Sequence, residues 1–76
     1  MSSFPSTEAL KQIYEQYPIG CRIELINMND PYTKLNPGDR GTVQFVDSIG
    51  TLHMKWDSGS TLGLICGVDC FRRVVE

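Results

Sequence analysis

The sequence predicts a mainly β protein, in which a small five-stranded barrel is preceded by one amphipathic α-helix. Apolar residues at helical spacing end at Pro18, and runs of alternating apolar and polar residues begin at Cys21. Turn sequences rich in glycine or proline separate these runs, as expected between short strands. The 76 residues, of which 41% are hydrophobic, suit a single small globular domain.

Residues 6–17 are expected to form the helix, and residues 1–5 a flexible arm before it. Ser6 is suited to cap the first turn, and Glu8 lies where the helix dipole favours an acid. Pro18 disfavours helical geometry at the residue before it, which ends the helix. The apolar stripe should pack against the barrel, and its alternative role is self-association. That stripe consists of Leu10, Ile13, Tyr14 and Tyr17.

Residues 18–76 are expected to form the barrel. Alternation predicts strands at 21–25, 41–46, 52–56, around 62–64 and at 71–75, with a single turn of short helix at 65–69. The long polar segment 27–39 ends in Asn-Pro-Gly-Asp, a typical turn sequence. A long first loop and a tight turn before the last strand are typical of an SH3-like barrel, in which closure removes exposed sheet edges. An OB-type barrel is the alternative, although it needs longer strands.

Composition excludes several classes of protein. Nine acidic and seven basic residues give a net charge of −2, the opposite of the balance that non-specific phosphate binding needs, so nucleic acid is not an expected partner. No run approaches the roughly 20 apolar residues of a membrane span, and no signal peptide is expected. Three cysteines cannot all pair within one chain, so we expect reduced thiols and a cytoplasmic location.

Three strings of residues carry a resemblance to a known family. They are Asn-Pro-Gly-Asp-Arg-Gly-Thr-Val at 36–43, Leu-His-Met-Lys-Trp-Asp-Ser-Gly-Ser at 52–60 and Gly-Val-Asp-Cys-Phe-Arg at 67–72. Together they resemble a small family of uncharacterised domains found in bacteria, plasmids and phages, over residues 17–74. The resemblance implies an SH3-like barrel. Because such domains occur on mobile elements, it also implies an accessory or host-manipulating role.

No pattern of catalytic or metal-binding residues stands out. The single histidine, His53, is expected on the outer face of its strand, with no third group to orient it toward a nucleophile. Cys66 and Cys70, with Cys21 and His53, could supply ligands for zinc, but the chain lacks the usual paired knuckles of two-residue spacing. We therefore expect no enzyme activity, no cofactor and no metal.

The long first loop and the hairpin between the third and fourth strands commonly flank a groove in SH3-like barrels. Aromatic side chains mixed with arginine and lysine can stack on a ring while they pair with a phosphate or carboxylate. Trp56 also fits the core, since it continues the alternation of Leu52 and Met54. One of the two adjacent arginines should face the core side and pair with Asp39 or Asp69. The ligand-binding candidates are Asp30, Tyr32, Lys34, Arg40, Trp56, Asp57, Arg72 and Arg73.

These observations predict a non-catalytic binding module, either a monomer or a homo-oligomer. The leading interpretation is an accessory protein that binds a protein or peptide in the groove between the first loop and the hairpin. One alternative is a phage or plasmid protein that sequesters a small anionic signalling nucleotide in a pocket at an oligomer interface. Another is a nucleic-acid-binding barrel, which the lack of a basic run argues against.

Overall fold

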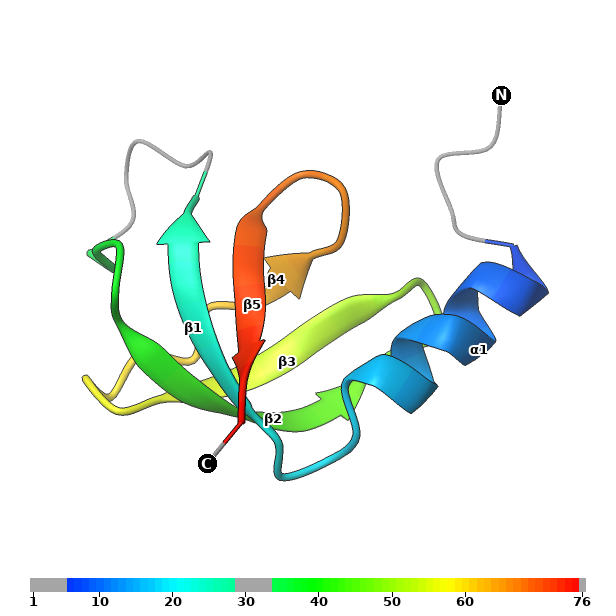
Figure 1. Cartoon of the computed structure of the whole chain (residues 1–76), viewed down its shortest axis with the longest axis horizontal. Helices are drawn as coiled ribbons and strands as arrows, with labels where there is room; N and C mark the ends of the chain where they lie inside the picture. The colour runs from blue at the N-terminus through cyan, green and yellow to red at the C-terminus, as the bar shows by residue number, and fades with distance from the viewer. Residues whose placement is uncertain (1–5, 29–33, 76) are drawn as a thin grey trace.

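One helix and five strands make up the fold in the computed structural model, which describes residues 6–28 and 34–75. The predicted arm at residues 1–5 lies outside the described residues. The strands form one antiparallel sheet in the order β4-β3-β2-β1-β5 (Figure 1). The mainly β class with an N-terminal helix is therefore confirmed. The elements are α1 (Thr7–Gln16), β1 (Arg22–Asn27), β2 (Arg40–Val46), β3 (Thr51–Trp56), β4 (Leu64–Ile65) and β5 (Cys70–Val74).

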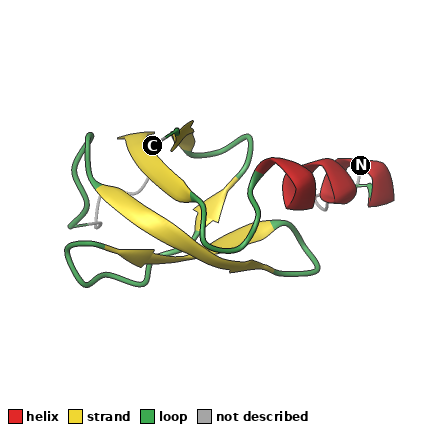
Figure 2. Cartoon of the chain, turned by 60° about the horizontal axis from the view of Figure 1, so that its bottom comes forward, coloured by secondary structure: helices red, strands yellow, loops and turns green. Residues whose placement is uncertain are grey.

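Helix α1 begins and ends as the sequence predicts. The Ser6 hydroxyl accepts a hydrogen bond from the backbone N–H of Ala9 at 3.2 Å, which satisfies a donor that the first turn leaves unpaired. Ile13 and Tyr17 pack against the hydrophobic core, and Figure 2 shows the helix beside one end of the sheet. Within residues 6–28 and 34–75, no helix is long and apolar enough to cross a membrane.

The core lies inside the curve of the sheet. Alternate residues of β1, β2 and β3 point inward, as the sequence pattern predicts. A fully buried side chain of this size contributes about 1.5–3 kcal/mol relative to an exposed one, so these few residues dominate the stability of the domain. The side chains exposed by 2% or less are Ile23, Leu25, Val43, Leu52, Met54, Trp56 and Leu64.

The curled sheet has two edges. β4 pairs with β3 only, and β5 pairs with β1 only, in the part of the chain that the structure describes. Cys66 and Asp69 form an isolated bridge in the connection between these two edge strands, but no ladder joins β4 to β5. The sheet is therefore not closed into a barrel by backbone pairing.

Two local predictions between β3 and β5 are wrong. Leu62 was expected to point inward in a fourth strand, but its side chain is 37% exposed and β4 begins two residues later. The carbonyl of Leu62 faces the core instead and accepts a hydrogen bond from the Trp56 indole at 2.7 Å. The predicted helical turn at 65–69 is a non-helical turn, because Gly67 has a φ of +88°, which a right-handed helix excludes.

Gly41 lies within β2, in the strand that alternation predicts at 41–46. A Cβ atom at this position would stand 2.9 Å from Trp56 Cε3 and 3.0 Å from both Lys55 O and Trp56 Cα. Such distances are shorter than ordinary van der Waals contact. The absence of a side chain therefore lets the indole lie directly against the β2 backbone.

Candidate functional site

Charged side chains cross three strands on the outer face of the sheet. Glu24 of β1 lies opposite Arg40 of β2 and opposite Arg72 of β5. Its Oε1 accepts from Arg40 Nε at 3.2 Å, and its Oε2 accepts from Arg72 Nε at 3.1 Å. These hydrogen bonds, with that from Arg72 the stronger influence, lower the pKa of Glu24. One carboxylate thus holds two guanidinium groups.

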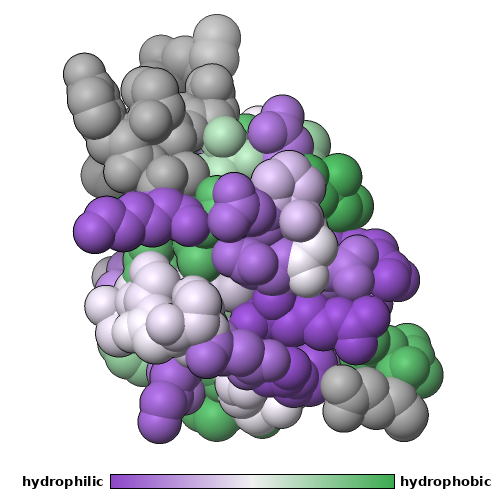
Figure 3. Space-filling model, turned by 90° about the vertical axis from the view of Figure 1, so that its left-hand side faces the viewer, coloured by the Kyte–Doolittle hydropathy of each residue, from purple (hydrophilic) through white to green (hydrophobic). Residues whose placement is uncertain are grey.

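A second ion pair lies next to the first along β1. Arg22 Nη1 and Nη2 donate to the two carboxylate oxygens of Asp57, at 2.8 and 2.5 Å, and Nη1 also donates to the Thr42 hydroxyl. The hydrogen bonds from Arg22 lower the pKa of Asp57. We call the five ionised residues the charged ladder: Arg22, Glu24, Arg40, Asp57 and Arg72. Figure 3 shows hydrophilic side chains gathered on the side of the molecule where β2 begins.

The structure brings together three of the residues predicted to bind a ligand, Arg40, Asp57 and Arg72, all of them in the charged ladder. Trp56 is 2% exposed, so its ring belongs to the core and cannot stack on a ligand. Lys34 is exposed. The candidates Asp30 and Tyr32 lie outside the described residues.

The predicted partners of the two adjacent arginines are wrong. Neither Arg72 nor Arg73 is buried. Arg72 pairs with Glu24 on the outer face, and Arg73 Nη1 donates to the backbone carbonyl of Gln16 at the end of α1, at 3.3 Å. Asp39 accepts instead from the backbone of its own turn, as Asp69 does from Ile65 at 2.9 Å. Arg73 avoids burial because β5 is an edge strand, where an inward-pointing long side chain reaches past the core to the surface.

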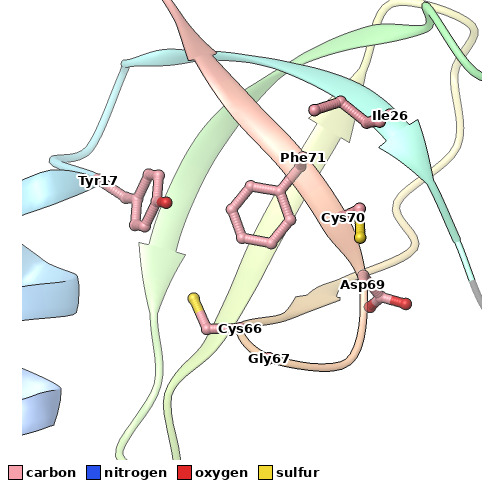
Figure 4. Close-up of a pocket in the computed structure, with 7 residues that line it drawn as sticks. All are labelled: Tyr17, Ile26, Cys66, Gly67, Asp69, Cys70 and Phe71. Carbon is pink, nitrogen blue, oxygen red and sulfur yellow. The ribbon is translucent and has the colours of Figure 1, made fainter.

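An apolar groove lies between the end of α1 and strand β5 (Figure 4). The rings of Tyr17 and Phe71 meet at a centroid distance of 5.4 Å, and the Cys66 side chain points into the space beside them. Burial raises the pKa of the Cys66 thiol and that of the Tyr17 hydroxyl. The groove has a volume of about 370 Å³. We call it the β5 groove, and its lining residues are Tyr17, Ile26, Cys66, Gly67, Asp69, Cys70 and Phe71.

Two tyrosines of the helix stripe, whose alternative predicted role was self-association, line two hollows. Tyr17 is shared between the β5 groove and a second one, of about 340 Å³, which also has Tyr14 and Phe45 in its walls. Tyr14 is 44% exposed, and its hydroxyl donates to the carbonyl of Asp47 at 3.3 Å. Leu10 is half-buried, and Ile13 packs on the core. The stripe therefore attaches the helix to the sheet and leaves one tyrosine partly open to solvent.

Backbone pairing shows which groups β5 presents at its edge. Leu25 donates to Asp39 O and accepts from Gly38 N, so its polar groups face the turn that leads into β2. Because these directions alternate along an antiparallel strand, Glu24 faces β5 and bonds with Arg72, its register partner. The backbone groups of Phe71 and Arg73 then point away from β1. Among residues 6–28 and 34–75 they have no partner strand, and we call them the free edge of β5, next to the β5 groove.

His53 has an orienting partner that sequence reasoning missed. Its Nε2 lies 2.8 Å from Asp47 Oδ2, and its ring stacks on Phe45 at a centroid distance of 4.2 Å. The hydrogen bond with His53 lowers the pKa of Asp47. Asp47 also accepts from Thr51 N in the same turn, so this group fixes the β2–β3 hairpin. Among residues 6–28 and 34–75, no three His, Cys, Asp or Glu side chains come together as a metal site.

Comparison with models of protein families identifies the family of this chain. Residues 6–74 match the model of a domain of unknown function, DUF4314. The chain belongs to this family. Neither the curated proteins nor the solved structures gave a match. The resemblance to an uncharacterised domain is therefore confirmed, and the match extends through the helix as well as the sheet.

Proposed function

We propose that this DUF4314 domain is a non-catalytic binding module that captures an extended segment of a protein partner along β5. On this proposal the curled sheet is an SH3-like fold with its opening between β4 and β5. The observation that carries it is an edge strand that, in the described part of the chain, has no partner strand on the side beside an apolar groove. Edge strands add peptides by main-chain hydrogen bonds, while neighbouring pockets select side chains.

The binding site differs from the groove between the first loop and the hairpin that the sequence suggested. At the hairpin, Trp56 is buried and Asp57 is held by Arg22, so neither side chain is free to receive an apolar ligand. The β5 groove instead combines two aromatic rings with a strand edge. Phe71 and Arg73 would supply two N–H donors and two carbonyl acceptors to an added strand.

Arg73→Pro tests this proposal because it removes an edge-facing N–H without touching the hydrogen bonds to β1. Proline is tolerated on edge strands where its nitrogen faces solvent. Arg73→Gln is the matched control, since it loses the same charge and keeps the N–H group. Peptides would be selected from a random library on the immobilised domain, and their affinity measured by calorimetry.

We expect peptides that bind the parent and Arg73→Gln but lose about tenfold in affinity with Arg73→Pro, the value of one hydrogen bond of about 1.4 kcal/mol. Circular dichroism would establish that Arg73→Pro is folded. If no peptide is selected, or if selected peptides bind the folded Arg73→Pro variant as well as the parent, binding along β5 is refuted.

A second candidate is the capture of a small anionic ligand, such as a signalling nucleotide, on the charged ladder. Its support is the convergence of two guanidinium groups on Glu24, because a phosphate could take the place of that carboxylate. Thermal denaturation with a panel of nucleotides tests it. A rise in melting temperature that Arg40→Gln abolishes would favour this candidate over peptide capture.

We also propose that the protein acts in the cytoplasm of a bacterium. It is encoded either by the bacterium itself or by a phage or plasmid that the bacterium carries. The odd number of cysteines supports a reducing compartment. The three thiols are unpaired, and Cys70 is exposed. Fractionation of the natural host followed by immunoblotting would test the location.

A further inference from the structure

The two faces of β5 differ, and this difference would select the side chains of a bound strand. Phe71 lies opposite the buried Leu25 and so points to the inner side, whereas Arg72 lies opposite Glu24 on the outer face. Arg73, opposite Ile23, is again on the inner side. A neighbouring strand alternates in the same way, so each of its residues meets one known environment.

The direction of an added strand follows from the sheet. Neighbouring strands are all antiparallel in the order β4-β3-β2-β1-β5, so the two edge strands β4 and β5 run the same way. A single strand placed in the opening between them is antiparallel to both. It would meet Arg73 first, then Arg72 and then Phe71 as it runs from its N-terminus.

Resting on the proposed function, we infer that the partner segment carries two consecutive acidic residues followed by a large apolar residue. The apolar side chain enters the β5 groove beside Phe71 and Tyr17. The two carboxylates meet Arg72 and Arg73, which each use one donor in the bonds described above. A guanidinium has five N–H donors, so both can bind a further carboxylate.

A second copy of the chain is a poorer occupant of this edge. Antiparallel pairing of two copies about the middle of β5 would set Arg72 opposite the same residue of the other copy. Like charges directly opposite each other destabilise a strand pair. Charge complementarity therefore favours an acidic peptide over self-association.

Short capped peptides test whether the charge of the partner's residues and their order along the strand matter. The core Glu-Glu-Leu would be compared with Gln-Gln-Leu, with the reversed Leu-Glu-Glu and with Glu-Glu-Ser, by calorimetry on the whole chain. We expect Glu-Glu-Leu to bind at least tenfold more tightly than each of the others. It should also slow the alkylation of Cys66, which lines the groove, relative to the unliganded domain.

A charge reversal gives an independent readout. Arg73→Glu should weaken binding of Glu-Glu-Leu at least tenfold and restore it for Lys-Glu-Leu, whereas Lys11→Glu, the same change on the exposed face of α1, should do neither. Peptides that require the free edge but show no preference for acid or for order would overturn this inference and leave peptide capture standing. No binding by any peptide, or a dimer in native mass spectrometry that Arg73→Pro dissociates, would overturn both.

Discussion

Adding one methyl group at Gly41 should destabilise the domain measurably. The Cβ of Gly41→Ala would stand 2.9–3.0 Å from three atoms of β3, and two of these, Lys55 O and Trp56 Cα, belong to the backbone. A rotamer change can therefore relieve only the contact with the indole. The strands β2 and β3 must separate locally, although Gly41 and Trp56 are register partners in their ladder.

The magnitude follows from two opposing effects. Overpacking of this kind costs about 1–3 kcal/mol of stability. Replacing glycine by alanine within a strand stabilises the fold by about 0.5–1 kcal/mol, because the unfolded chain has less conformational entropy to lose. The mid-values of the two effects leave a net loss of about 1 kcal/mol, which lowers the melting temperature by about 4–8 °C in a domain of this size. A domain of this length has a margin of about 3–5 kcal/mol, so the effect is large.

Urea unfolding followed by fluorescence is the assay, because Trp56 is the only tryptophan of the chain and is buried. Gln44→Ala, at an exposed position of β2, is the control and should change stability by less than about 0.5 kcal/mol. The double variant Gly41→Ala with Trp56→Leu, followed by circular dichroism, should be less destabilised than the sum of the singles. A Gly41→Ala variant as stable as the parent would refute the packing argument.

Two further changes test the charged ladder and the helix. Because the pKa of Glu24 is lowered, its contribution to stability is fully present above the ordinary carboxyl range and is lost as the pH falls from that range through the lowered pKa of the folded state. Glu24→Gln should therefore lower the melting temperature at neutral pH and flatten its dependence on pH between about 7 and 3; parallel profiles would contradict this. Ser6→Ala should cost about 0.5–2 kcal/mol, since it removes the bond to Ala9 N, and unchanged thermal unfolding would argue that the helix contributes nothing.

The periodic parts of the fold could be predicted from the sequence. Alternation of apolar and polar residues predicts that Ile23 and Leu25 are buried, and the same alternation predicts burial of Met54 and Trp56. Such patterns work because one face of a strand must lie against the core. The prediction failed between β3 and β5, where Leu62 fits the alternation but a hydrogen bond from Trp56 to its carbonyl decides the orientation.

The candidate site was harder to predict, since it depends on contacts between distant segments. Arg40 and Arg72 could be named as candidate ligand-binding residues, but their common partner Glu24 follows only from the register of β1 with β2 and β5. The β5 groove likewise joins the end of α1 to Phe71. The sequence carries one indication of the groove, since the apolar residues Ile26 and Phe71 had no assigned role in the core.

The order of the strands has a consequence for how the chain folds. β2, β3 and β4 follow one another through short turns, whereas β5 must find β1 from the other end of the chain, as the pairing of Arg22 with Val74 requires. The chain must lose conformational entropy to bring such distant segments together before their contacts stabilise it. β5 should therefore dock last and detach first, with faster amide exchange than β2 or β3. A ligand bound to the free edge of β5 would slow that detachment and so lower the rate at which the domain unfolds.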